Sequence, residues 1–525
     1  MYAQAEIGED YPRPSGPLSA ARPGKAARRL IIALIVGVLA GAAIMLQVKG
    51  WGTLAGEAGG ACGSGDDGAS YGACPRGITP ALVLSFLIGL PAVPFAVALL
   101  FRRGWIRRAI VVIGAAAGLL AGQALFAVWH GTDLPVAWAA PRDSSNELAT
   151  VGVWTTGDSL VRIRADQVAS YAAATGRARW TLAVPGTDTA CAASANPGAP
   201  GASVPAAGVT AGVGLVGYGQ GESTCDHVMA VDLATGRQLW TEQIQDPYSG
   251  NDPAGTLAVS GPAAVVLTAG GLAGVDARTG AQRWTLPAPS NECAFQQLAA
   301  SGTSLVAVAA CDASYYVVAV DPATGKKAWQ SRVSETSDSY QFEILSARPV
   351  VVNDGVPGPR ETSQVRVFSA AGAMTASFSV SGLTVDGQDT SLDTDPSHGF
   401  GAPDVVAGGL LVGPTEASDG KSALVAFRLS DGRRQWLVPT PDEVHEVSAY
   451  GGEMLLVDES DPAYSLEEVS AETGALHSLG YFAQGVLQSG DSGLYPVGGQ
   501  DIIVNLNGDT WNPPVAALTP PAAKG

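Results

Sequence analysis

The sequence predicts an all-β fold, an eight-bladed β-propeller of four-stranded blades, preceded by three transmembrane α-helices. Two observations carry this prediction: a short motif that recurs between residues 170 and 511, and three long apolar runs within the first 130 residues. A period of about 40–50 residues is typical of propeller blades, each of which holds about four short strands. Seven blades are the alternative, if the last segment only closes the first blade.

The repeated motif is an apolar run, then Thr-Gly, then a tryptophan four residues after the glycine. A glycine can take the positive φ that closes a turn, and a tryptophan can bury its ring between sheets while its indole N–H reaches a carbonyl. The motif therefore predicts architecture and no catalytic residue. Its clearest and looser copies together place Gly176, Gly236, Gly280, Gly325 and Gly432 before Trp180, Trp240, Trp284, Trp329 and Trp436.

The chain between two such glycines has the pattern of a blade. Residues 257–284 hold three short apolar runs and the start of a fourth, separated by Gly-Pro and Gly-Gly turns. The expected propeller spans residues 149–514, followed by a disordered tail at 515–525. We expect a strand from the other end of the domain to complete the last blade, because closure removes exposed sheet edges.

The complete motif, Ala-x-Asp-x-x-Thr-Gly-x-x-x-Trp, stands at Ala230–Trp240 and Ala319–Trp329. It resembles the tryptophan-docking motif of the pyrroloquinoline-quinone-like (PQQ-like) eight-bladed propellers. The resemblance extends from near Ala149 to Pro514. It implies the fold and leaves the function open, because that fold serves quinoprotein dehydrogenases, an outer-membrane assembly factor, and many sensor or scaffold proteins.

The first part of the chain predicts an anchor in the lipid bilayer. Residues 30–48, 80–101 and 109–129 are apolar runs long enough to span a membrane. Residues 1–29 are expected to form a disordered cytoplasmic tail, 49–79 an external loop, and 130–148 a linker to the propeller.

Most of the basic residues that flank these runs lie on one side, since the external loop 49–79 holds only Lys49 and Arg76, and this bias predicts the orientation. The positive-inside bias places the N-terminus in the cytoplasm, and three spans then place the propeller outside the plasma membrane of a multi-pass protein. The basic residues on the cytoplasmic side are Arg22, Lys25, Arg28, Arg29, Arg102, Arg103, Arg107 and Arg108.

The six cysteines support an oxidising compartment. They fall into three local pairs, and none lies in an expected cytoplasmic segment. In two blades, one cysteine begins the first strand and the other precedes the third strand, so the same disulfide is expected twice. Buried free thiols are the alternative. The expected pairs are Cys62 with Cys74, Cys191 with Cys225, and Cys293 with Cys311.

Glycines at regular spacing in the expected spans allow close helix packing. Gly37 and Gly41 lie in the first span, and Gly114, Gly118 and Gly122 lie in the third. Such spacing can drive a homodimer. Packing within the three-helix bundle is the alternative that we favour.

The chain carries 48 acidic against 30 basic side chains, for a net charge of −18. The propeller has no basic patch, so nucleic acid is not an expected partner. An acidic stretch at 381–404 includes Asp393 and Asp395, which could hold calcium, although the spacing does not match an EF-hand. A solvated acidic loop is the favoured interpretation.

No catalytic residue and no cofactor are expected. A quinoprotein dehydrogenase resembling this family would hold PQQ with calcium on the propeller axis and usually has a disulfide between adjacent cysteines, and no two cysteines here are neighbours. We therefore expect a noncatalytic binding or scaffold module for an envelope protein or a small ligand. A quinone-dependent dehydrogenase with a degenerate site and an envelope protein assembly factor are the two alternatives.

Overall fold

The computed structural model describes residues 25–519, apart from a set of internal ranges. These ranges are 58–62, 65–69, 72–77, 103, 131–132, 146–147, 195–211, 221–224, 245–254, 312–313, 336–340, 356–363, 381–382, 386–387, 391–404, 417–420, 442, 451–452, 461–462, 484–485, 487–491 and 506–511. The chain divides into two compact units, Met1–His130 and Gly131–Gly525.

Three helices form the first unit. They are α1 (Lys25–Glu57), α2 (Ile78–Phe101) and α3 (Trp105–His130), and each contains a stretch long and apolar enough to cross a bilayer. The paired strands β1 (Gly63–Ser64) and β2 (Ser70–Tyr71) lie between α1 and α2 in the sequence.

The regularly spaced glycines hold α1 and α3 together. A Cβ on Gly37 would lie 2.5 Å from the Val111 carbonyl oxygen, and a Cβ on Gly114 would lie 2.6 Å from that of Leu34. Gly41, Gly118 and Gly122 meet the opposite helix in the same way. These faces are occupied within one chain, as the favoured interpretation predicted, and they give no support to a homodimer.

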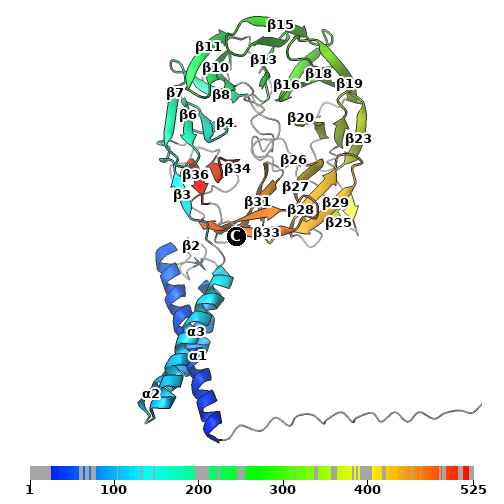
Figure 1. Cartoon of the computed structure of the whole chain (residues 1–525). Helices are drawn as coiled ribbons and strands as arrows, with labels where there is room; N and C mark the ends of the chain where they lie inside the picture. The colour runs from blue at the N-terminus through cyan, green and yellow to red at the C-terminus, as the bar shows by residue number, and fades with distance from the viewer. Residues whose placement is uncertain are drawn as a thin grey trace, which may run out of the picture. The chain divides into compact units, whose positions relative to one another are not determined.

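The second unit contains eight antiparallel sheets of four strands, which form a ring (Figure 1). This confirms eight blades over the alternative of seven. Each blade runs from an inner to an outer strand in chain order, apart from the last. Blades 1 to 4 consist of β4 (Thr150–Thr156), β5 (Ser159–Arg164), β6 (Gln167–Ala172) and β7 (Ala178–Ala183); β8 (Thr189–Ala193), β9 (Val213–Gly219), β10 (His227–Asp232) and β11 (Arg237–Gln243); β12 (Leu257–Ser260), β13 (Ala263–Thr268), β14 (Gly271–Asp276) and β15 (Gln282–Pro287); and β16 (Cys293–Ser301), β17 (Ser304–Cys311), β18 (Ser314–Val320) and β19 (Lys327–Glu335).

The second half of the ring repeats this plan. Blades 5 to 7 consist of β20 (Gln341–Ala347), β21 (Val350–Gly355), β22 (Gln364–Phe368) and β23 (Met374–Ser379); β26 (Val405–Ala407), β27 (Leu410–Glu416), β28 (Ser422–Arg428) and β29 (Arg434–Pro439); and β30 (Glu443–Tyr450), β31 (Glu453–Ser460), β32 (Ala463–Val469) and β33 (Leu476–Ala483). A hairpin of β24 (Leu383–Val385) and β25 (Gln388–Thr390) precedes blade 6.

Blade 8 closes the ring with strands from both ends of the unit. Its order is β34 (Ser492–Val497), β35 (Gln500–Asn505), β36 (Val515–Leu518) and then β3 (Val136–Ala139), with Ala139 paired to Ala516. The expected completion by a strand from the other end is therefore present.

Two expected boundaries are wrong for the same reason. The expected linker at 130–148 contains β3, and the expected tail at 515–525 begins with β36. Both segments are short and rich in alanine and proline, so neither carries a strong strand pattern alone. They form strands because each pairs with the other.

Small apolar side chains between neighbouring blades make the core. Eight clusters of buried residues each join one blade to the next, and the eighth joins blade 8 to blade 1. Inner and middle strands are buried on both faces, as in β12 and β13, whereas outer strands such as β11 are largely exposed. A strand packed on both faces reads as a continuous apolar run, which explains the sequence pattern.

Candidate functional site

An aromatic ring on the outer strand of one blade packs on a glycine of the next blade. A Cβ on Gly280 would lie 2.9 Å from the Trp240 ring, and the Trp240 indole N–H donates to the Ala277 carbonyl at 2.9 Å. Both residue types are needed because the ring covers a turn whose glycine has a φ of 72°. The same contact joins Trp138 to Gly176, Trp180 to Gly236, Trp284 to Gly325, Trp329 to Gly372, Phe378 to Gly432, and Trp436 to Gly474.

The five tryptophans and five glycines of the sequence motif thus lie at blade interfaces. Sequence reasoning missed two aromatic members, Trp138 and Phe378. Trp138 precedes Trp180 by 42 residues, which is one blade length, but no Thr-Gly stands before it. Phe378 follows Gly372 by six residues rather than four, so only the spacing of its neighbours could have located it.

The aspartates of the motif cap the turns. Asp232 Oδ1 accepts hydrogen bonds from the backbone N–H groups of Ala234 and Thr235, each at 3.1 Å. The Arg283 guanidinium, and then the backbone N–H of Thr279, lower the pKa of Asp276 to about 2. These carboxylates stay charged to complete a turn and are occupied by local donors.

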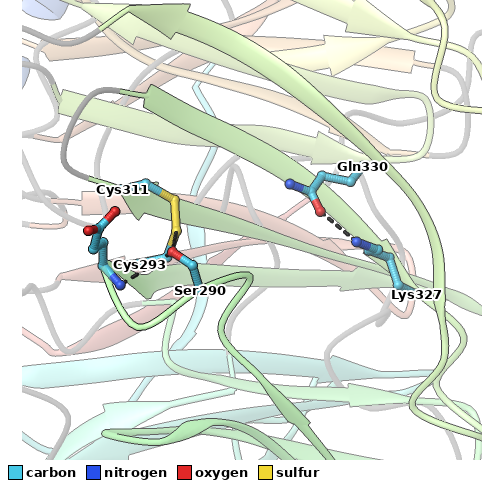
Figure 2. Close-up of a disulfide and its surroundings, with 6 residues drawn as sticks. Ser290, Cys293, Cys311, Lys327 and Gln330 are labelled. Atoms are coloured by element: carbon cyan, nitrogen blue, oxygen red, sulfur yellow. Dashed lines mark hydrogen bonds between the residues drawn. A yellow bond between two sulfur atoms is a disulfide. The ribbon is translucent and has the colours of Figure 1, made fainter.

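Two disulfides lie in blades 2 and 4. Cys191 and Cys225 are bonded, with their Cα atoms 6.0 Å apart, and Cys293 and Cys311 are bonded, with theirs 4.0 Å apart. Figure 2 shows the second bond joining the start of β16 to the end of β17, where the two cysteines are direct cross-strand neighbours. Cys62 and Cys74 lie outside the described residues.

A buried polar network, which we call the closure network, connects the two ends of the propeller. Arg162 of β5 binds Asp143 through two hydrogen bonds, of 3.1 and 2.7 Å, and its Nε donates to Thr150 Oγ1 at 2.7 Å. The Thr150 hydroxyl in turn donates to the Asn505 carbonyl at 3.0 Å. The network therefore links the chain entering blade 1 to the last strands of blade 8.

Asn505 extends the closure network within blade 8. Its amide nitrogen donates to the carbonyls of Pro513, at 2.7 Å, and Val486, at 3.1 Å, while its amide oxygen accepts the Ser492 hydroxyl at 2.9 Å. A buried amide with its oxygen and nitrogen both bonded can hold the approach to β36 in one position. The function of this network is structural closure.

A strongly perturbed ionisable group lies between the inner strands of blades 7 and 8. Glu446 of β30 is 2% exposed, and its cross-strand partner Val457 packs in the same cluster as Leu494 of β34. Within the described chain, no donor makes a hydrogen bond of good geometry to either carboxyl oxygen, although the Leu494 backbone N–H favours the charged form. Burial therefore raises the pKa of the Glu446 carboxyl well above its usual range.

Tyr495 of β34 is influenced by the charge of Glu446. Burial, and after it the Glu446 carboxyl, raise the pKa of Tyr495 well above its usual range. The residue as a whole keeps part of its surface exposed while its hydroxyl lies in densely packed surroundings. Tyr495 itself packs against the cluster that joins blade 8 to blade 1. Sequence reasoning missed the buried Glu446, because a lone glutamate in a strand normally marks the exposed face.

A quinone with calcium would lie on the propeller axis, next to the inner strands. The eight inner strands contain no lysine, arginine or aspartate. Over the described ranges, no group of three or more His, Cys, Asp or Glu side chains could hold a metal ion. Asp393 and Asp395 lie in the undescribed range 391–404.

The three-helix unit contains a shallow apolar groove between α1 and α2. Its lining includes Ala43, Phe86 and Leu90, with Gln47 and Ser85 as polar members. The Gln47 side-chain oxygen accepts the Trp51 indole N–H at 3.1 Å, and the Ser85 hydroxyl donates to the Leu82 carbonyl at 2.7 Å. These local bonds leave the groove apolar, as expected of a surface in contact with lipid chains.

Comparison with known proteins places this architecture in a family. The family model described as outer membrane protein assembly factor BamB matches residues 164–438, more than half of the chain. A comparison with curated proteins finds no match. Among solved structures, BamB from Moraxella catarrhalis is 16% identical, covering 73% of this chain and 99% of its own, with a TM-score of 0.43.

Two further solved structures also match this chain. Quinohemoprotein alcohol dehydrogenase from Comamonas testosteroni is 14% identical, covering 75% of this chain and 77% of its own, with a TM-score of 0.43. Sqt1 from Saccharomyces cerevisiae is 10% identical, covering 74% and 99%, with a TM-score of 0.41. At these identities the likeness concerns the fold alone. The match of the family model over more than half of the chain shows that this protein belongs to the BamB family of PQQ-like repeat propellers.

Proposed function

We propose that this protein is a noncatalytic scaffold that holds an envelope protein at the outer surface of the plasma membrane. The proposal rests on the structural role of the residues that the motif repeats. The motif aromatics, glycines and aspartates all serve blade docking or turn capping. Each blade also ends in an outer strand with an outward edge, and in the described chain the edge of β33 is partly covered, because the Leu134 N–H donates to the Tyr481 carbonyl at 2.7 Å.

The outer strands have the exposure and the free edge that a protein partner needs. β11 stands at the edge of its sheet, and five of its seven residues are exposed. An exposed edge offers unpaired backbone N–H and C=O groups, to which an extended segment can add as a further strand. The family relationship to an assembly factor favours the same class of partner.

Charge and cysteine placement support an extracytoplasmic propeller. The basic residues that flank the helices favour a cytoplasmic N-terminus, and three spans then carry the propeller across the membrane. The disulfides of blades 2 and 4 suit an oxidising compartment.

Labelling of intact cells tests the orientation. Glu242→Cys, on exposed β11, is expected to react with a membrane-impermeant maleimide, whereas Arg108→Cys, at the start of α3, is expected to react only after permeabilisation. Reaction of Arg108→Cys alone in intact cells would reverse the proposed topology.

Photocrosslinking of the full chain in cells tests the scaffold. A photoreactive residue at Glu242, on the free edge of β11, is expected to crosslink one or a few defined envelope proteins. The matched probe at Pro262, exposed in the turn between β12 and β13, is expected to miss them. Equal capture by both probes would contradict recognition through the strand edge. Oxidation of alcohols or sugars by the full-length protein with added PQQ and calcium would contradict the noncatalytic assignment.

A further inference from the structure

Arginines gather at one end of the three-helix unit. Arg28 and Arg29 stand near the start of α1, Arg102 follows the end of α2, and Arg107 and Arg108 stand near the start of α3. This set is called the arginine end. Four of the five side chains are exposed and that of Arg107 is partly buried.

Helix packing brings these arginines, which are far apart in the sequence, to a similar height along the helix bundle. Gly37 of α1 meets Val111 of α3, and Gly122 of α3 meets Ala42 of α1, so the two helices run side by side in the same direction. α2 follows α1 in the sequence and runs in the opposite direction. Leu99, near the end of α2, therefore packs in one cluster with Ala33 and Val111. At a rise of about 1.5 Å per residue, the five arginines fall within roughly two turns of one another along the bundle.

The arginine end has no compensating acid on these helices. α2 and α3 contain no aspartate or glutamate, and the one acid of α1, Glu57, stands at the opposite end. In the described part of the chain these guanidinium groups form no ion pair. Trp105, 78% exposed beside them, is of the type that settles at the level of lipid headgroups.

We propose that the arginine end binds the headgroups of anionic phospholipids. Five positive charges held together repel one another unless anions lie among them, and in a bilayer the anions at this level are lipid phosphates. A guanidinium group can also bind a phosphate through two parallel hydrogen bonds, whereas lysine binds it as a point charge. The orientation of the helices in the membrane requires only positive charge at this end, which lysine would supply as well as arginine. Lipid binding at this end does not depend on what the propeller binds.

Lipid retention by the full-length protein tests the proposal. The protein is released from nanodiscs of equal phosphatidylglycerol and phosphatidylcholine, and the retained lipids are counted by native mass spectrometry. Wild type is expected to prefer phosphatidylglycerol. The pair Arg107→Ala and Arg108→Ala is expected to lower that preference by on the order of tenfold, since each juxtamembrane arginine contributes roughly fivefold and neighbours partly compensate.

Two matched variants separate binding from insertion. Arg107→Lys with Arg108→Lys keeps the charge that orients the helices, and we expect it to lose about threefold of the preference. Lys49→Ala removes a cation at the other end of α1 and is expected to change nothing. Equal retention of both lipids by wild type would overturn the proposal, and so would an unchanged preference in both arginine pairs.

Discussion

Arg162 and Asp143 form an enclosed ion pair, with Nη2 and Oδ2 2.7 Å apart and each side chain 2% exposed. The carboxylate also accepts a hydrogen bond from Arg164 at 2.8 Å. Asp143 stands before the first strand of blade 1 and Arg162 stands in its second strand, so the pair fixes the incoming chain against the ring. A charge that is buried this completely depends on its partner, because no water can replace it.

Asp143→Asn is therefore expected to lower the free energy of unfolding by about 3–5 kcal/mol, because it leaves the Arg162 charge buried without its counterion. Urea unfolding followed by tryptophan fluorescence measures the change. The matched control is Asp158→Asn, which removes an exposed ion pair with Arg179 and is expected to have no measurable effect. Similar losses in both variants would show that enclosure is not the cause.

Gly236→Ala is expected to destabilise the propeller by about 3 kcal/mol, from overpacking together with left-handed strain. The added methyl would overlap the Trp180 ring, and the residue has a φ of 70°. Gly261→Ala has the same strain, with a φ of 56°, but no atom within 4 Å of the added Cβ. The difference between the two free energies of unfolding measures the docking contact between Trp180 and Gly236. Equal values would show that this contact does not contribute to stability.

The stability of a propeller produced without the helices is expected to depend on the residue at which the shortened chain begins. A chain starting at residue 131 keeps β3 and Trp138, whereas one starting at residue 141 loses both and uncovers β36 and Gly176. Loss of a packed tryptophan alone costs about 3 kcal/mol or more. Calorimetry is expected to show a clearly lower Tm for the shorter chain, and equal Tm values would show that β3 contributes nothing to closure.

Glu446→Gln is expected to raise the free energy of unfolding, and increasingly so with rising pH. The unfolded chain loses the Glu446 proton near the ordinary pKa of 4.5, while the folded chain keeps it to a higher pH. Over that window the unfolded state binds fewer protons, so wild-type stability falls as pH rises, by at most about 1.4 kcal/mol per pH unit.

Glutamine resembles the protonated acid and does not titrate, so the two proteins are expected to match below pH 4.5 and to diverge above it. Urea unfolding across the acidic to mildly alkaline range measures the divergence. Glu242→Gln on exposed β11 is the control and is expected to show no such divergence. A constant difference between Glu446→Gln and wild type at every pH would contradict the buried, protonated state.

The sequence predicted the arrangement of strands in a blade closely where local signals, the apolar runs and the turn residues between them, specify each strand. In blade 3 the three apolar runs expected within residues 257–284 correspond to β12, β13 and β14, because apolar runs and glycine turns specify strands without distant help. The count of eight followed from the motif spacing. The cysteine pairs of blades 2 and 4 followed from their shared register.

What the sequence could not predict depends on contacts between distant segments. Trp138 carries no local motif and acquires its role from Gly176 across the closing interface. Arg162 lies in an ordinary strand pattern, and only the position of Asp143 makes its burial tolerable. Glu446 is buried by blade 8, whose strands come from both ends of the propeller. Such residues are defined by partners far along the chain.

The pairing of Ala139 with Ala516 also sets the order of events during synthesis. β3 is made just after the last helix and must wait for β36, which leaves the ribosome roughly 20 to 75 s later at ordinary elongation rates. Throughout that interval an unpaired strand edge stands beside the nascent blades. A stop codon just before β36 would leave that early strand without its partner, so a strand that is translated late decides the fate of the first strand of the propeller.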